Sequence, residues 1–463
     1  MSNAKQGYTF RKLIGDLHLW LGIGAGLVLF VVCLSGTIFT FRNEIVQAVE
    51  SKAYHVTPPA GARPLAAATL VAKLKQAHPE SQVTALMVPQ EADQAWTLTL
   101  TTKAALKRQL AEEAHERAAA ASHGAKGAHG GHGGEKGRGG KGKKAGHGRN
   151  QDSQTLLVNP YTGAVQGNVD TGLSKFFFGV MGLHRWLLIE GGVGQIIVGV
   201  STIIFLVLEL TGLVLWAPAK LKQWRNWKMW KPGFNIKWDA NWKRINHDLH
   251  NTLGFYSFGL LTVMALTGLC WSFEWYRTGT SALFGAKVFG GRGEQPLPSA
   301  LPATPGRTLS ADDFLALTSR RLPAPGDVRL TLPKGPAGSA SVLKTPTGFF
   351  TLAATDRLTL DQYSGAVLKA DIFADKPWNE QVVALIRPLH IGDVYGTFTK
   401  ILYFLACLIA TSLPITGVLI WLNKLKKKNK RTLPLRQAAP ASPAPTEARQ
   451  PVLAAVGTSF RQS

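Results

Sequence analysis

Cysteine and acidic residues are both scarce in this sequence. Three cysteines occur in 463 residues, Cys33, Cys270 and Cys407, and each lies inside a long apolar run. Three isolated thiols of this kind do not suggest a disulfide framework. No G-x-G-x-x-G fingerprint follows a strand-like segment, so we expect no nicotinamide- or flavin-binding Rossmann domain. The sequence has 28 acidic residues against 52 lysines and arginines, which gives a net charge of +24.

Long apolar runs are what the sequence does contain. Four of them are almost free of charge and reach the roughly 20 residues of helix that cross about 30 Å of hydrocarbon. They cover residues 17–41, 193–216, 250–275 and 394–421. The first run exceeds the apolar core of a signal peptide and no clear A-x-A site follows it, so we expect it to remain as an anchor. The expected fold class is therefore a membrane α-helical protein with a four-helix transmembrane bundle.

Basic residues gather on alternate sides of these runs. They occur in residues 1–16, in the loop 217–249 and in the tail 422–463. If the chain crosses four times, these segments share one side, and the positive-inside rule places that side and both termini in the cytoplasm of a bacterial inner membrane. Tryptophans alternate with the loop lysines, as at lipid headgroups, which disfavours nucleic acid as a partner. The loop tryptophans are Trp224, Trp227, Trp230, Trp238 and Trp242.

Two segments, 42–182 and 276–389, are then expected in the periplasm. Each reads as a small α+β domain because a helical pattern is followed by short strand-like runs. In the first we expect a helix at 66–78 and strands at 83–88, 95–102 and 154–158. In the second we expect a helix at 310–320 and strands at 328–332, 341–343, 349–353 and 358–361.

Residues 103–150 interrupt the first segment with a run rich in Ala, Gly, Lys and His. Such a composition cannot build a core, so we expect a disordered insertion. Its histidines could bind metal weakly, but the glycine and lysine background favours solvated low complexity. The candidates are His123, His129, His132 and His147. The tail at 433–463, rich in Ala, Pro and Gln, is also expected to be disordered.

The two halves of the chain contain an internal repeat. The sequence NPYTGAV at 159–165 resembles DQYSGAV at 361–367, and TGLVLW at 211–216 resembles TGVLIW at 416–421. Histidines lie at similar distances from these motifs in both halves. Membrane proteins built from parallel repeats place functional sites between the halves. We therefore expect a duplicated span–domain–span unit.

Four histidines lie where the spans begin. His18 and His250 open the first and third spans at the cytoplasmic face, and His184 and His390 precede the second and fourth at the outer face. Each face thus offers one pair of imidazoles, which can ligate haem iron from both sides across a bundle. No C-x-x-C-H motif occurs, so two haem b groups are expected. The alternative role for any one of these histidines is an interfacial polar residue or a helix cap.

Neighbouring residues support the pairs. Glycines follow His18 and His250 on the same helix face and leave room for a macrocycle or for another helix. They are Gly22, Gly26 and Gly254. Basic residues nearby are candidate partners of haem propionates, namely Arg11, Arg185, Arg244 and Arg387. His247, three residues from His250, is the reserve ligand.

Two further residues stand out inside the spans. Glu209 lies within the second, and an acid at that depth is a functional hypothesis by default. Glu209 either holds a proton that accompanies electron transfer or pairs with a loop lysine, and the sequence leaves both interpretations open. Pro414 in the fourth span is expected to kink that helix.

Several of these motifs together resemble the PepSY-associated transmembrane proteins. The resemblance rests on HLWLG at 18–22, HRWLL at 184–188, DLHNTLGFY at 248–256, the two TGxxxW span ends and the Y-[T/S]-G-A-V turns. It covers nearly all of residues 8–425, and the insertion at 103–150 departs from it. The turns are similar to the end of the PepSY fold, which implies two PepSY-like periplasmic domains.

The family includes inner-membrane siderophore reductases, so the resemblance implies haem at His18, His184, His250 and His390. The implied function is electron transfer through two bis-histidine haems to a ferric siderophore or another metal chelate, from an unidentified cytoplasmic donor. The implied enzyme class is a haem-dependent metalloreductase. Two other functions stay open: a haem-free, membrane-anchored PepSY protein that binds a partner, and a metal-uptake accessory protein.

Overall fold

The computed structural model describes residues 9–124, 152–290, 297–302 and 307–432. The chain divides into two units, residues 1–420 and 421–463. Four segments of the described residues have the length and apolar composition of membrane spans, which agrees with the four expected from the sequence. They are Phe10–Thr40, Val193–Trp216, Trp242–Ser272 and Gly396–Lys426.

Three of these spans are single helices, and the third is composite. The single helices are α1 (Phe10–Thr40), α7 (Val193–Trp216) and α15 (Gly396–Thr432). The third span runs through α9 (Trp242–Asp248), a π-helical turn (Leu249–Leu253) and α10 (Gly254–Ser272). Helix α1 begins before residue 17 because an α-helix can continue beyond the hydrocarbon, where water satisfies its polar side chains. The kink at Pro414, which lies inside α15, stays a prediction.

The helices of the bundle pack closely through small and apolar residues. Helix α1 contacts α7 and α6, and α10 contacts α7 and α14. Small side chains between spans allow the helix backbones to approach one another. The buried cluster consists of Leu261, Ala406 and Ala410, with Cys33, Phe205, Leu260 and Met264 packed against it.

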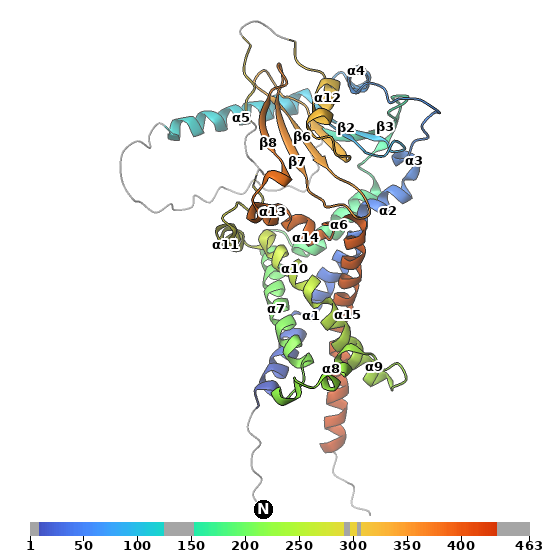
Figure 1. Ribbon diagram of the computed structural model, residues 1–463, viewed down its shortest axis with the longest axis vertical. Coiled ribbons are helices and arrows are strands. Elements are labelled where there is room, and N and C mark those ends of the chain that lie inside the picture. The colour runs from blue at the N-terminus through green and yellow to red at the C-terminus, as the bar shows by residue number, and fades with distance from the viewer. Residues whose placement is uncertain (1–8, 125–151, 291–296, 303–306, 433–463) are drawn as a thin grey trace, which may run out of the picture. The chain divides into compact units, whose positions relative to one another are not determined.

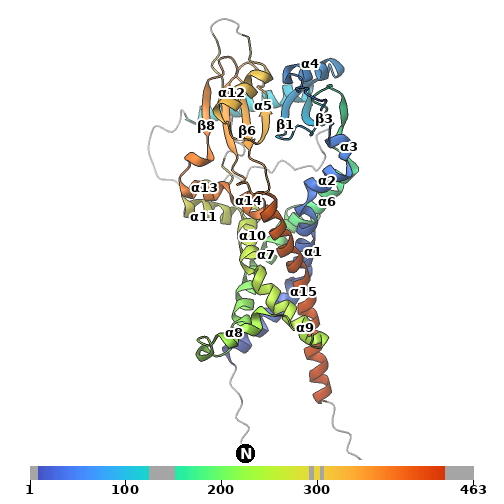
Figure 2. The ribbon, with the colours of Figure 1, turned by 45° about the vertical axis from the view of Figure 1, so that its right-hand side comes forward.

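An antiparallel sheet of eight strands lies beyond one end of the bundle (Figures 1 and 2). Its strand order is β4-β3-β2-β1-β5-β6-β7-β8. Strands β1 to β4 come from the segment before α7 and β5 to β8 from the segment before α15. The two sets join where β1 pairs with β5, so both segments contribute to one continuous sheet. The strands are β1 (Ser81–Val88), β2 (Trp96–Thr102), β3 (Ser153–Val158), β4 (Val165–Asn168), β5 (Asp327–Thr331), β6 (Ser339–Thr345), β7 (Asp356–Asp361) and β8 (Val367–Asp371).

Two helices, α4 (Ala67–Ala77) and α12 (Ala311–Arg321), pack on the buried face of the sheet. Alternate residues of the strands point toward them and form the core, as a half-buried antiparallel sheet requires. Asp312 accepts hydrogen bonds from the N–H groups of Ala67 and Ala68 at 2.7 and 2.8 Å, so α12 caps α4. The core includes Leu70, Leu74, Leu86, Leu98, Leu100, Val158, Phe314, Leu330, Val342, Leu358 and Leu360.

The turns after β3 and β7 share one hydrogen-bond pattern. The side chain of Asn159 accepts from the N–H groups two and three residues on at 2.9 and 3.3 Å, and Asp361 does so at 2.9 Å for both. Gly163 and Gly365 have positive φ angles of 76° and 70°, which glycine adopts without strain. Burial opposes ionisation of Asp361, but backbone N–H groups and the Ser364 hydroxyl outweigh it and lower its pKa to about 2.

The expected disorder of residues 103–150 is wrong for the first part of that range. Residues 103–124 form helix α5 (Lys103–Gly124), because Ala, Lys, Gln, Glu and Arg are strong helix formers. Ala105 and Leu106 are buried, and α5 contacts β2. Residues 125–151 lie outside the described residues, and so do the candidate metal ligands His129, His132 and His147 and the tail at 433–463. Nothing in the structure bears on metal binding by His123.

The expected strand at 349–353 is also wrong. Phe349 and Phe350 lie in a turn, and Leu352 forms only an isolated bridge with Tyr395. Apolar composition there reflects contact between Phe350 and Phe398, whose rings stack at 4.5 Å, rather than strand pairing. Strands β4 and β8 were not expected, because their short and polar sequences lack a clear alternation.

Short helices lie at both ends of the bundle (Figures 1 and 2). We call the end that carries the sheet the sheet-side end and the end with α8 and α9 the loop-side end. Exposed aromatics occur at both, including Trp275 and Trp378 at the first and Trp227 and Trp242 at the second, as expected at membrane–water interfaces. The short helices are α2 (Arg42–Val49), α3 (Ser51–Tyr54), α6 (Gly172–Trp186), α8 (Trp227–Phe234), α11 (Glu274–Phe284), α13 (Trp378–Ala384) and α14 (Ile386–Ile391).

Candidate functional site

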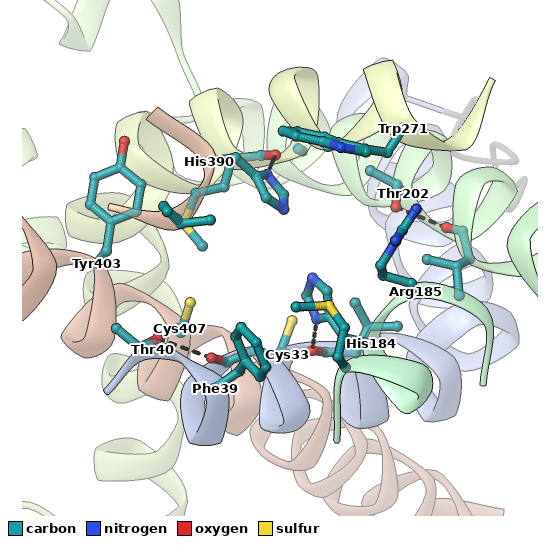
Figure 3. A pocket seen from close by; sticks show the side chains of 18 of the residues that line it. Cys33, Phe39, Thr40, His184, Arg185, Thr202, Trp271, His390, Tyr403 and Cys407 are labelled. Carbon is teal, nitrogen blue, oxygen red and sulfur yellow. Dashed lines mark hydrogen bonds between the residues drawn. The ribbon is translucent and has the colours of Figure 1, made fainter. Parts of the chain in front are cut away.

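His184 and His390 face each other at the sheet-side end of the bundle (Figure 3). His184 lies in the last turn of α6 and His390 in α14, and their ring centroids are 6.1 Å apart with planes inclined by 55°. We call them the sheet-side pair. The chain brings together two residues that are more than 200 positions apart in the sequence.

Local sequence fixes where these two histidines lie. Helix α6 begins with a capping box between Thr171 and Ser174 and ends where Leu187 and Leu188 adopt left-handed φ angles of 54° and 57°. Non-glycine residues pay roughly 1–3 kcal/mol for such conformations, which persist where the surroundings require them. Helix α14 ends at Gly392 with φ 82°, where a Cβ atom would lie 2.5 Å from the Tyr403 side chain.

Backbone carbonyls hold the Nδ1 atoms of the sheet-side pair. His184 Nδ1 lies 2.9 Å from the carbonyl oxygen of Val32, and His390 Nδ1 lies 2.9 Å from that of Met264. A carbonyl can only accept, so each Nδ1 carries the proton and each Nε2 keeps a lone pair. Metal-ligating histidines have this arrangement, because the acceptor of the Nδ1 proton fixes the tautomer and the ring orientation.

His18 and His250 form an equivalent pair toward the loop-side end. Their ring centroids are 6.3 Å apart and their planes are nearly perpendicular, at 89°. We call them the loop-side pair. His18 belongs to α1, and His250 lies in the π-helical turn before α10, a distortion that often occurs at functional sites. His247, the reserve candidate, instead lies 3.4 Å from Asp248 with a largely exposed side chain.

Threonine hydroxyls replace the carbonyls at the loop-side pair. His18 Nδ1 lies 2.9 Å from Thr211 Oγ1, and His250 Nδ1 lies 2.8 Å from Thr416 Oγ1. Each hydroxyl already donates its single hydrogen to a carbonyl of its own helix, at 2.8–3.1 Å. It must therefore accept from Nδ1–H, and again Nε2 keeps the lone pair.

A glycine of a neighbouring helix lies under each of the four rings. A Cβ atom would be 3.2 Å from the His184 ring at Gly36 and 2.9 Å from the His390 ring at Gly268. At the loop-side pair the equivalent distance is 3.4 Å for both Gly212 under His18 and Gly417 under His250. Glycine is required most strongly at the sheet-side pair, because these distances are shorter than ordinary van der Waals contacts.

The distances across both pairs suit a metal ion between the rings. Two metal–nitrogen bonds of roughly 2 Å, added to the depth of the two rings, place the centroids of opposed imidazoles roughly 6 Å apart. Among the described residues no group of three or more His, Cys, Asp and Glu side chains could hold a metal ion.

A cavity of about 500 Å³ surrounds the sheet-side pair (Figure 3). This volume is in the range of small-molecule and cofactor sites. Its walls are mostly apolar, and Trp271 lies against His390 with ring centroids 5.1 Å apart. The lining side chains include Leu29, Phe39, Val198, Phe205, Leu261 and Met264.

Four cationic side chains belong to the cavity lining. Arg42, Arg185 and Arg387 belong to it, together with Lys400, which pairs with Glu44 at 2.6 Å. Among the described residues, no acceptor forms a hydrogen bond with the buried Nε of Arg42. Burial raises the pKa of Asp393 in the same lining, although Arg387 and Lys400 oppose this shift. The lining can therefore accommodate anionic groups.

The four arginines that the sequence suggests as partners of haem propionates have different surroundings in the structure. Arg185 and Arg387 line the cavity, and their role as partners of propionates stays a prediction. Arg11 instead donates to the carbonyls of Val214, Leu215 and Ala217 at the end of α7. Arg244 pairs with Asp248 at 2.8 Å. Both loop-side arginines thus have partners within the protein.

The sequence did not identify the residues behind the histidines. The repeat of Thr211-Gly212 and Thr416-Gly417 is visible in the sequence. The sequence alone does not show that these residues hold His18 and His250. The signal was available, because a hydroxyl acceptor followed by a residue without a side chain occurs at matched positions. Val32 and Met264 act through backbone carbonyls, which carry no sequence signal. Arg42 was also missed.

A comparison with known protein families finds one family whose model matches most of the chain. The model of the family described as the PepSY-associated TM region matches residues 16–424. The match includes all four histidines and every strand of the sheet, and it confirms the resemblance inferred from the motifs. No curated protein matches the chain.

Proposed function

We propose a function for a chain that belongs to the family of the PepSY-associated TM region: transmembrane electron transfer through two b-type haems, one at each histidine pair. The observation that carries the proposal is the geometry of the two pairs. Both have ring centroids 6.1–6.3 Å apart, and all four Nδ1 atoms have an acceptor. Histidine pairs of this kind would hold haem iron through their Nε2 atoms.

The residues around the sheet-side pair fit a haem. The glycines under the rings and the 500 Å³ cavity leave room for a flat macrocycle. Arg42, Arg185 and Arg387 would hold the propionates by charge-assisted hydrogen bonds. Haem supplies reversible one-electron chemistry when bound, and the protein contributes ligation, burial and nearby charge.

The two pairs are close enough to act in sequence. On α7, Gly212 under His18 is ten residues from Thr202 in the sheet-side cavity, and on α15 Gly417 is ten residues from Cys407. Ten residues of helix rise roughly 15 Å. Both sites thus lie within the roughly 30 Å depth of the hydrocarbon and together span much of it.

The proposed orientation follows from charge. By the positive-inside rule, the basic residues at the loop-side end favour an orientation in which this end and both termini lie on the cytoplasmic side of a bacterial inner membrane and the sheet lies in the periplasm. Electrons then pass from an unidentified cytoplasmic donor to an acceptor beside the sheet. A ferric siderophore or another ferric chelate is the proposed acceptor, since hard oxygen ligands bind Fe(II) more weakly than Fe(III).

We further propose that the two halves are duplicated span–domain–span units. The matching turns at Asn159 and Asp361, the paired helices α4 and α12 and the two Thr-Gly supports favour this arrangement. In that arrangement each haem takes one ligand from each half.

Visible spectroscopy of the detergent-purified protein tests the function. We expect a reducible Soret and α-band pattern with about two haems per chain, and about one after His184→Ala or His18→Ala, because each pair holds its haem through both imidazoles. His247→Ala is the matched control and should keep both haems. A colourless protein from haem-replete cells, or an unchanged haem content in the two ligand variants, contradicts the proposal.

A further inference from the structure

Glu209 is a partly buried acid within a membrane span, and the ligation of the two histidine pairs does not use it. Its Oε2 accepts a hydrogen bond from the Thr262 hydroxyl of α10 at 3.0 Å. Its Oε1 is buried, and among the described residues no group forms a hydrogen bond with it. A lone carboxylate oxygen inside a membrane bundle is costly unless it carries a proton or faces a compensating charge.

The hydrogen bond between Glu209 and Thr262 lies between the two histidine pairs. On α7, Glu209 is two residues from Thr211, which holds His18 of the loop-side pair. On α10, Thr262 is two residues from Met264, whose carbonyl holds His390 of the sheet-side pair. The two helices run in opposite directions, so one side-chain contact joins the stretches of backbone that support both pairs.

The groups that face Glu209 do not neutralise it. Cys33 of α1 is within electrostatic range, and Cys407 of α15 is close to Cys33. Thr262 faces it from α10, and Thr211, which holds His18 of α1, is two residues further along α7. Within the described part of the chain, no lysine or arginine forms an ion pair with Glu209, so the loop-lysine partner considered from the sequence is not supported.

We infer that Glu209 takes up a proton when a neighbouring histidine site gains an electron, so that electron transfer through the bundle is linked to proton uptake. The inference rests on the proposed function. An added electron makes the low-dielectric interior more negative, and this field favours the neutral form of a nearby carboxyl group. The uncommitted Oε1 is the atom that receives the proton.

The step balances in charge. One electron enters the site from a one-electron donor, and one proton from water forms an O–H bond at Glu209 Oε1. When the electron leaves to the acceptor, the O–H bond breaks and the proton returns to water. Over the cycle the region around Glu209 gains and loses one electron and one proton. The negative charge of the electron is therefore always compensated by the proton.

Redox titration of the purified full chain at several pH values tests the inference. For the unchanged protein we expect the midpoint potential of at least one haem to fall with pH, toward a limit of about 59 mV per unit, the one-electron equivalent of a tenfold change in proton concentration. Glu209→Gln should abolish most of that slope. Glu274→Gln, which removes an exposed acid outside the cavity, should retain it. A redox-difference infrared band of a protonated carboxyl group should disappear in Glu209→Gln alone.

The outcomes separate the two proposals. A protein that binds no haem contradicts the proposed function. A protein with two haems whose potentials do not change with pH, or whose slope survives in Glu209→Gln, overturns the role of Glu209 and leaves the function standing. If Glu209→Gln does not assemble, Thr262→Val answers the same question. It removes the donor to Oε2, so the slope should begin at a higher pH, and an unchanged curve overturns the inference.

Discussion

The two histidine pairs are alike where their rings face each other and different behind the rings. Their centroid distances differ by only 0.2 Å, yet backbone carbonyls hold the sheet-side pair and threonine hydroxyls hold the loop-side pair. A carbonyl cannot be removed by substitution, whereas a hydroxyl can. The same tautomer is thus fixed at both pairs. Hydroxyls lie at both histidines of the loop-side pair, whereas at the sheet-side pair the Thr267 hydroxyl lies 3.3 Å from His390 Nδ1 in addition to the Met264 carbonyl.

The two pairs also differ in how closely a glycine packs under each ring and in the charged side chains near the rings. The glycines under the sheet-side rings are in tighter contact than those under the loop-side rings. Cationic side chains line the cavity at the sheet-side pair, while Arg11 and Arg244 at the loop-side end have partners in the protein. Substitutions behind each pair should therefore affect one haem and spare the other.

The largest difference is expected from alanine at the supporting glycines. Gly268→Ala would place a Cβ atom 2.9 Å from the His390 ring, so we expect roughly half of the total haem to be lost through overpacking of the site. Gly212→Ala, at 3.4 Å from the His18 ring, should keep both haems. The haem-to-protein ratio measures this, and equal losses in both variants would show that the two sites have the same tolerance.

An intermediate effect is expected from the threonines. Thr211→Val and Thr416→Val remove the acceptor of Nδ1–H, and loss of such a partner typically weakens metal binding by about 10–100-fold. Only the loop-side haem should respond, in its affinity and in its low-spin electron paramagnetic resonance signal. Thr280→Val is the matched control, because that hydroxyl donates to the Tyr276 carbonyl of its own helix, α11, and does not line the cavity. A changed sheet-side signal in Thr211→Val would contradict the assignment.

The smallest effect is expected from Arg42. Arg42→Gln removes one cation from the sheet-side cavity, which should weaken haem retention there by about 1 kcal/mol, roughly fivefold. Transfer of haem to an apoprotein scavenger measures the rate of loss. Arg277→Gln, at an exposed ion pair, is the control and should have no effect. Faster loss of the loop-side haem in Arg42→Gln would place the propionates elsewhere.

Much of the fold could be predicted because its signals are local. The spans follow from length and charge, and α7 begins and ends at the residues expected. Most strands were found from alternation, but β4 and β8 were missed, since short polar strands are defined by pairing with β3 and β7 rather than by their own sequences. The joining of β1 to β5 was also missed, because pairing between distant strands leaves no local pattern.

The four histidines of the candidate site could be predicted from the sequence, and the residues that hold them could not. His18, His184, His250 and His390 stood out because they recur at span starts, and the structure brings them together as the two pairs expected. The repeat also contained the Thr-Gly supports, yet their contact with a histidine of another helix depends on helix packing. The Val32 and Met264 carbonyls could not be predicted, because every residue has one.

The pairing of β1 with β5 has a consequence for biogenesis. Val88 and Val328 are partners although 240 residues, including two spans, separate them. Until residues 327–331 reach the same side of the membrane, β1 has an open edge that invites pairing with other chains. The first four strands can therefore complete their pairing only after the second half of the chain has been made and lies on the same side of the membrane.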